Sequence, residues 1–245
     1  MRLPHKKENR MKLRRIIAAA AAVSIFGAAS AQAAFTDVEG HWAADVINSL
    51  ADRGVINGVS DNTFNPEGTV TRAEFLKMAM TAVGIQKVSL RKGECLDATA
   101  SDWYAPYLQS ALDKGLIPED MIAGYSARVE SDEDGSTYAH YTGAFNGNLN
   151  INREEMSVIL QYVYQYTRNA LTMQYMSGKS DITFTDGNEI SGWAYEAVRL
   201  AYANGFIGGM EDGSFAPKDN ATRAQAATVI NRLIEKSESR GETNE

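Results

Sequence analysis

Three arginines occupy the same place in three similar stretches of the sequence. Arg72, Arg153 and Arg223 each follow a phenylalanine by eight residues and each stand directly after a threonine or an asparagine. The planar guanidinium group of arginine binds a carboxylate through two parallel hydrogen bonds, a contact worth about 1.5–3 kcal/mol. The arginines are therefore candidate binding residues for an anionic ligand. The alternative is that each pairs with a nearby Asp or Glu and only stabilises the fold, and Glu154 strengthens this alternative for Arg153.

A tryptophan and an aspartate precede each arginine. Aromatic faces stack on the C–H surfaces of sugars, but a tryptophan that opens an amphipathic helix usually belongs to the core, and the sequence favours the core. The aspartates are typical of turns that a carboxylate closes by hydrogen bonding to nearby backbone. These residues are Trp42, Trp103, Trp193, Asp37, Asp97 and Asp186.

The sequence contains no catalytic motif. It has no His-Glu-x-x-His, no Gly-x-Ser-x-Gly, no glycine loop for a phosphate and no cysteine with a plausible histidine partner. A single cysteine excludes an intramolecular disulfide and any multi-cysteine zinc or iron–sulfur site. Nothing places two carboxylates in one repeated cleft, as a glycosidase would need. We therefore expect no enzyme activity, no metal and no cofactor.

A threefold repeat of two predicted helices positions the candidate residues. Each tryptophan is followed twelve residues later by a glycine, which suits the C-terminal cap of a first helix. The distance from this glycine to the phenylalanine is ten residues in the first and third copies and thirty in the second. The second copy therefore carries an insertion of 20 residues, 125–144, which begins acidic and becomes aromatic. The insertion is either a mobile loop or a small hairpin.

The second helix of every copy opens with a capping box. In this motif the cap side chain accepts the amide of the third helical residue, whose side chain reaches back to the cap amide. Loss of a cap residue costs about 1 kcal/mol. A unit of two amphipathic helices cannot bury its apolar faces alone, so we expect the copies to share one core and fold cooperatively. The predicted boxes are Thr71 with Glu74, Asn152 with Glu155, and Thr222 with Gln225.

The first 33 residues have the pattern of a cleaved signal peptide. Residues 1–15 are strongly basic, residues 16–30 are apolar, and Ala31 and Ala33 suit cleavage after Ala33. The apolar run is shorter than the roughly 20 residues that cross a bilayer, and a retained anchor is the alternative. The expected organisation is a signal peptide at 1–33, repeats at 34–90, 91–170 and 180–235, and a disordered tail at 236–245.

Charge limits the partners of the mature chain. Residues 1–33 hold seven of the 24 basic residues and one of the 31 acidic residues, so 17 basic and 30 acidic residues remain after cleavage. Nonspecific affinity for nucleic acid comes mainly from cations, and so acidic a chain is repelled by phosphate. No later stretch is long and apolar enough to span a membrane. We expect neither nucleic acid nor membrane as a partner.

Three segments carry a family resemblance. FTDVEGHWA (35–43), GVINGVSDNTFNPEGTVTRAEF (54–75) and GFIGGMEDGSFAPKDNATRAQ (205–225) closely resemble S-layer homology (SLH) repeats. The resemblance covers residues 35–83, 95–165 and 184–235. The second copy departs from the pattern at Cys95, which replaces an aromatic residue, at Gly147, which replaces a proline, and in Asn-Arg-Glu-Glu at 152–155.

The resemblance implies a fold and a function. The fold would be all-α, a pseudo-threefold bundle with a shared central core. Grooves between neighbouring lobes would hold a cell-wall glycan, often ending in a pyruvylated sugar, or a modified peptidoglycan in some relatives. The arginines would contact this ligand, the tryptophans would border the grooves, and an aspartate could touch a sugar hydroxyl.

The leading hypothesis is a secreted, non-catalytic module that anchors to cell-wall polysaccharide at the cell surface. The alternative is a structural or assembly subunit of the cell envelope that binds a separate envelope protein, with little glycan binding.

Overall fold

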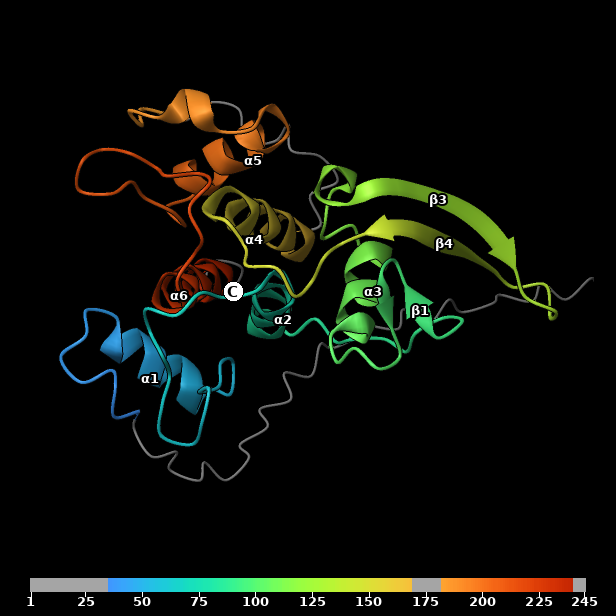
Figure 1. Ribbon diagram of the computed structural model, residues 1–245, viewed down its shortest axis with the longest axis horizontal. Helices are drawn as coiled ribbons and strands as arrows, with labels where there is room; N and C mark the ends of the chain where they lie inside the picture. The colour runs from blue at the N-terminus through green and yellow to red at the C-terminus, as the bar shows by residue number, and fades with distance from the viewer. Residues whose placement is uncertain (1–34, 169–181, 240–245) are drawn as a thin grey trace, which may run out of the picture. The chain divides into compact units, whose positions relative to one another are not determined.

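The computed structural model describes residues 35–168 and 182–239, which belong to one compact unit. The predicted signal peptide, residues 1–33, lies outside these ranges. Within them the chain forms six α-helices, two 3-10 helices and four strands (Figure 1). The α-helices are α1 (Ala44–Asp52), α2 (Arg72–Ala82), α3 (Ala105–Asp113), α4 (Arg153–Thr167), α5 (Gly192–Ala203) and α6 (Arg223–Glu238). The 3-10 helices are η1 (Glu119–Met121) and η3 (Gly187–Glu189), and the strands are β1 (Glu94–Cys95), β2 (Ala98–Thr99), β3 (Ala123–Ser131) and β4 (Thr137–Ala144).

The all-α prediction is wrong, because the second copy contains two small antiparallel sheets. The insertion forms the hairpin β3–β4, in which Ser131 pairs with Thr137 next to the turn. The second sheet pairs Cys95 with Ala98 and buries the cysteine, where burial raises the pKa of the thiol to about 12. Both sheets lie in the parts of the sequence that depart from the helical repeat, so the helical pattern carries no signal for them.

The three predicted capping boxes are present. Thr71, Asn152 and Thr222 precede α2, α4 and α6, and each side chain accepts the amide of the third helical residue. The caps therefore fix where each second helix begins, which is at the candidate arginine, one residue after the cap.

A ring of three backbone hydrogen bonds joins the copies where these helices begin. The amide of Val70 donates to the carbonyl of Ala221 (3.2 Å), Ala221 donates to Ile151 (2.9 Å), and Ile151 donates to Val70 (3.0 Å). Each bond joins a different pair of copies. The closed ring therefore gives the three copies a cyclic arrangement that no single copy can form.

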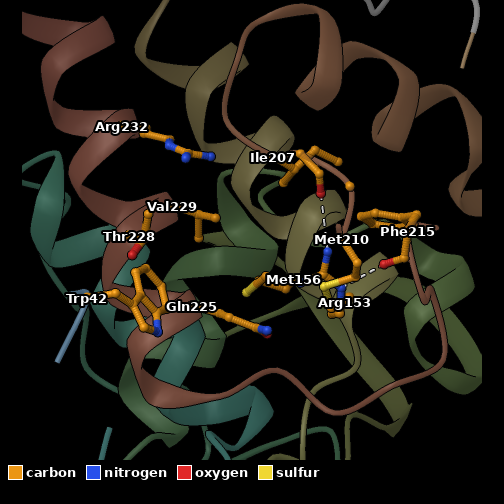
Figure 2. Close-up of a pocket in the computed structure, with 12 residues that line it drawn as sticks. Trp42, Arg153, Met156, Ile207, Met210, Phe215, Gln225, Thr228, Val229 and Arg232 are labelled. Atoms are coloured by element: carbon orange, nitrogen blue, oxygen red, sulfur yellow. Dashed lines mark hydrogen bonds between the residues drawn. The ribbon is translucent and has the colours of Figure 1, made fainter. Parts of the chain in front are cut away.

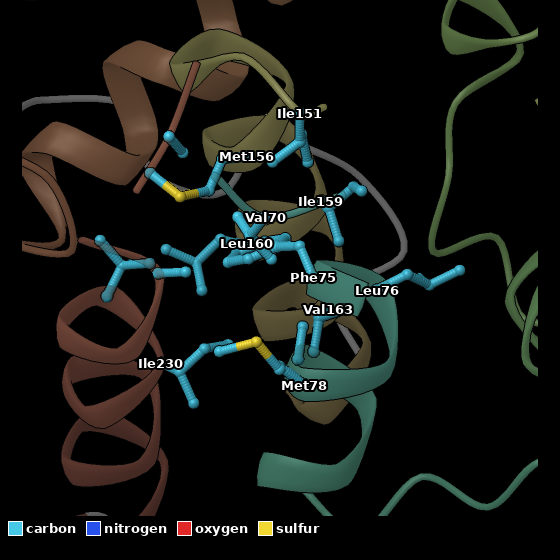
Figure 3. Packing of buried hydrophobic residues seen from close by; sticks show 14 of the residues in the cluster. Val70, Phe75, Leu76, Met78, Ile151, Met156, Ile159, Leu160, Val163 and Ile230 are labelled. Atoms are coloured by element: carbon cyan, nitrogen blue, oxygen red, sulfur yellow. The ribbon is translucent and has the colours of Figure 1, made fainter. Parts of the chain in front are cut away.

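The second helices pack pairwise on one another, and each first helix packs on the second helix of a different copy. α1 contacts α6, α3 contacts α2, and α5 contacts α4. The buried hydrophobic residues form one cluster with members from all three copies. Figure 3 shows Val70, Phe75, Ile159 and Ile230 of this cluster between the helices. The two helices of a copy are thus held in a core that the other copies complete.

The last helix, α6, is longer than the sequence predicts. α6 continues to Glu238, three residues into the segment 236–245 that was expected to be disordered. None of the helices in 35–168 and 182–239 combines the length and apolar character needed to cross a bilayer.

Candidate functional site

The three candidate aspartates hold the loops that precede the second helices. Each carboxylate accepts two consecutive backbone amides, those of Phe64 and Asn65 for Asp37, Phe145 and Asn146 for Asp97, and Phe215 and Ala216 for Asp186, at 2.6–2.8 Å. The second residue of each pair has a positive φ, which non-glycine residues rarely adopt. The aspartates thus stabilise a strained turn 27 to 49 residues away, a tertiary contact rather than the local turn expected from the sequence.

The charge of Asp37 is favoured by this contact. Burial opposes ionisation, but the amides of Phe64 and Asn65 and the nearby Arg223 together lower the pKa of the carboxyl below its ordinary value. Because both oxygens of Asp37, Asp97 and Asp186 already accept amide hydrogen bonds, their observed role is to shape the loops beside the grooves described below.

Two of the arginines connect neighbouring copies through backbone carbonyls. Arg153 Nε donates to the carbonyl of Phe215 (2.7 Å) and its Nη2 to Gly208 (3.3 Å). Arg223 Nε donates to Phe64 (2.8 Å) and its Nη2 to Asn57 (2.8 Å). Each guanidinium also lies over the ring of that phenylalanine, at 5.1 and 4.5 Å from the centroid. In all four of these hydrogen bonds the acceptor is a backbone carbonyl and not a carboxylate.

Arg72 has a different set of partners. It lies 4.8 Å from the ring centroid of Phe145, but its Nη1 forms an ion pair with Glu155 and its Nη2 donates to the carbonyl of Met121 (2.6 Å). Its Nε is buried without a hydrogen-bond partner among the described residues. For Arg72, the structure therefore shows the pairing with a carboxylate that the sequence left open as the alternative to ligand binding.

The interpretation of the tryptophans as core residues is wrong. Trp42 is 65%, Trp103 50% and Trp193 36% exposed. Each stands just before or at the start of a first helix, where its ring remains accessible. Their exposure makes them available to a sugar face, the role that the sequence placed second.

Groove 1, a cavity of about 250 Å³, combines residues of all three copies. The first copy supplies Trp42, the second Arg153, and the third the loop after α5 and one face of α6. Figure 2 shows Trp42 and Gln225 on one side of the space and Arg153 and Met210 on the other. The lining residues are Trp42, Arg153, Met156, Ile207, Gly208, Gly209, Met210, Phe215, Gln225, Thr228, Val229 and Arg232.

Groove 2, of about 220 Å³, repeats this arrangement with the copies permuted. The second copy supplies Trp103, the third Arg223, and the first the loop after α1 and one face of α2. Lys77 Nζ lies 5.7 Å from the centre of the Trp103 ring, within the range of a cation–π interaction. The lining residues are Val55, Ile56, Asn57, Gly58, Val59, Phe64, Glu74, Lys77, Met78, Trp103 and Arg223.

The structure thus brings the candidate residues together in pairs, Trp42 with Arg153 and Trp103 with Arg223. Trp193 and Arg72 line neither groove. Six charged or polar lining residues were not candidate ligand contacts from the sequence: Asn57, Glu74, Lys77, Gln225, Thr228 and Arg232. Lys77 and Arg232 occupy positions that differ between the copies, so the repeat gives no signal for them. Glu74 and Gln225 were assigned only to their capping boxes. The described ranges contain no group of three His, Cys, Asp or Glu residues that could hold a metal ion.

Comparison with known proteins places these repeats in a family. The profile of the S-layer homology domain matches residues 34–76 and 183–227, the first and third copies. The second copy, with its insertion and its hairpin, lies outside both matches.

Similar proteins share most of this chain. An amylopullulanase of Thermoanaerobacterium thermosulfurigenes is 36% identical over 203 residues, 83% of this chain and 10% of that protein. Exoglucanase XynX of Acetivibrio thermocellus is 35% identical over 203 residues, 83% of this chain and 16% of that protein. The surface-layer 125 kDa protein of Lysinibacillus sphaericus is 26% identical over 207 residues, 82% of this chain and 15% of that protein. The chain thus spans less than a fifth of the length of each of these relatives.

These matches confirm the resemblance noted in the sequence. S-layer homology domains are non-catalytic modules that attach cell-surface proteins to the cell wall, which is the localisation predicted above, and as a class they bind cell-wall polysaccharide. Residues 34–76 and 183–227 of this chain are S-layer homology domains.

Proposed function

We propose that this chain is a non-catalytic anchor that binds an acidic cell-wall polysaccharide through grooves 1 and 2. The observation that carries the proposal is the repeated arrangement of the two grooves. Each places an exposed tryptophan opposite a largely buried arginine, with an apolar floor of loop and helix side chains. An aromatic face suits the C–H surface of a sugar, and a guanidinium suits a carboxylate or phosphate on it.

The arrangement also favours a polymeric ligand. Each groove is small and open, so a single sugar would bind weakly. Two grooves on one rigid unit raise the effective concentration of the second contact, because the first contact holds the polymer close. A wall polymer that carries both acidic and neutral units along its length is the kind of ligand that can use both grooves. A pyruvylated secondary polymer and a modified peptidoglycan both meet this description.

Sedimentation with purified cell-wall sacculi tests the proposal. The chain that begins at Ala34 is mixed with sacculi before and after extraction of the secondary polymer, and the bound fraction is measured. We expect the chain to sediment with intact sacculi and to remain in solution after extraction. Binding that survives extraction would assign the ligand to peptidoglycan. A chain that stays in solution with both preparations would contradict wall anchoring and favour a subunit that binds an envelope protein.

A further inference from the structure

Grooves 1 and 2 differ at the third residue of the capped helix. Gln225 occupies this position in groove 1 and Glu74 in groove 2, and Glu155 occupies it beside Arg72. The three residues are equivalent in the repeat, and each completes a capping box. A glutamine and a glutamate have nearly the same shape, so the difference between the grooves at this position is one of charge.

The capping box uses only one terminal atom of this side chain. Glu155 Oε2 accepts the amide of Asn152 (3.1 Å), which leaves Oε1 for the ion pair with Arg72. Glu74 Oε2 accepts the amide of Thr71 (2.8 Å), and its negative charge acts on Arg223. Gln225 Oε1 accepts the amide of Thr222 (3.3 Å), so only a neutral NH₂ group remains. Gln225 is therefore the one residue of the three that brings no negative charge to its junction.

Groove 1 is consequently positive. Arg153 and Arg232 are its charged lining residues, and no carboxylate lines it. Arg153 is only 7% exposed, and burial lowers the pKa of its guanidinium. The acids that act on Arg153 are Asp186 and Asp219; neither lines the groove, and both oxygens of Asp186 accept loop amides. An anion entering groove 1 would meet a desolvated positive charge without a lining carboxylate to displace.

Groove 2 has a different balance. Glu74 lines it together with Lys77 and Arg223. A carboxylate within the groove offsets part of the positive charge and repels an incoming anion, because like charges interact strongly where water is partly excluded. The exposed face of Trp103 remains available for a sugar that carries no charge.

We propose that Gln225 makes groove 1 the site for the anionic group of the wall polymer, a carboxylate or a phosphate, and that Glu74 leaves groove 2 to neutral sugar units. The inference rests on the proposed wall-binding function and assigns its two grooves different ligands. Gln225 and Glu74 act as specificity-determining residues.

Two reciprocal substitutions test this division of ligands. Gln225→Glu should keep the fold, because glutamate completes the capping box in the other two copies. Glu74→Gln should keep it for the same reason, because glutamine completes the third box. The tryptophan indole N–H signals in nitrogen–proton NMR spectra give a separate readout for each groove, since Trp42 lines groove 1, Trp103 lines groove 2 and Trp193 lines neither.

The probes are three small molecules: a methyl hexoside with a carboxyethylidene ketal, the methyl ester of the same compound, and glycerol phosphate. We expect the ketal acid or glycerol phosphate to shift the Trp42 signal, the stronger of the two identifying the anionic group, while the ester has little effect. Gln225→Glu should weaken this response about tenfold or more. Glu74→Gln should make the Trp103 signal respond to the same anion.

Three results would overturn the inference: equal responses of Trp42 and Trp103 in the unchanged chain, no response of either to any probe, or an unchanged anion affinity in Gln225→Glu. Sacculus sedimentation separates this failure from failure of the proposed function. If the unchanged chain binds sacculi and Gln225→Glu binds them equally well, only the assignment of groove 1 is wrong. If the unchanged chain does not bind sacculi, wall anchoring itself is wrong.

Discussion

The guanidinium of Arg72 and the carboxylate of Glu155 form an ion pair across the boundary between the first and second copies. Both side chains are largely buried, and the other oxygen of Glu155 caps α4. One residue therefore holds the start of its own helix and a charged group of the neighbouring copy. The equivalent position beside Arg153 holds Gln225, and there the arginine instead relies on the carbonyls of Phe215 and Gly208.

Removal of the charge of Glu155 should destabilise the fold. Glu155→Gln retains the capping box but leaves Arg72 without its ion-pair partner, which should lower the free energy of unfolding by about 1–3 kcal/mol. Glu74→Gln is the matched control, because Glu74 caps α2 and no hydrogen bond joins it to Arg223 among the described contacts. Urea titration measures both variants. Equal losses would show that the ion pair contributes nothing beyond the cap.

Truncation of Arg153 or Arg223 should also lower stability. Each arginine donates two hydrogen bonds to loop carbonyls of another copy and covers a phenylalanine ring, so alanine removes both hydrogen bonds and the ring contact. We expect a loss of about 1–3 kcal/mol in each variant, measured by urea titration. This expectation replaces the one that the repeat alone suggests, in which the cap needs no arginine and truncation costs little. Arg53→Ala, which removes an exposed ion pair with Glu238, should change stability by less than about 1 kcal/mol.

Stability should depend on the ionisation of Asp37. Its pKa is lowered in the folded chain, so the carboxylate stabilises the fold at pH values above its ordinary pKa of 3.8. This stabilisation is lost as the pH falls below that value and through the lower folded pKa. The difference in melting temperature between the unchanged chain and Asp37→Asn should therefore be largest near neutral pH and shrink towards pH 2.5. A difference that stays constant across this range would show that the carboxylate charge has no part in holding the loop. Asp52→Asn, at an exposed position in α1, is the control.

A single copy should not fold by itself. α1 packs on α6, and Val70 donates its hydrogen bond to Ala221, so a fragment of residues 34–90 lacks the partners of both. We expect this fragment to show poorly dispersed amide signals and no sharp thermal transition, while the chain from Ala34 melts in one step. A sharp transition of the fragment would contradict a core that the copies share.

The sequence by itself determined the repeat, the start of each second helix and the identity of the family. These features depend on local chemistry: a capping box is complete within four residues, and the spacing of the tryptophans, glycines and arginines can be counted. The same locality explains why the fold class was wrong. The β3–β4 hairpin lies in the insertion, which has no copy elsewhere. The short sheet lies where Cys95 departs from the repeat, so the helical repeat predicts neither sheet. The candidate aspartates were expected to close local turns for the same reason, because the loop amides that they accept lie 27 to 49 residues away in the sequence.

Only the tertiary structure decided which residues share a site. Trp42 and Arg153 are 111 positions apart and belong to different copies, yet they line one groove because each first helix packs on the second helix of another copy. The exposure of the tryptophans has the same origin, since each first helix packs on another copy while the tryptophan at its start stays exposed. The charge of each groove likewise depends on which capping residue faces which arginine. That pairing is set by the closed ring of three copies, a contact between distant segments that no spacing within one copy contains.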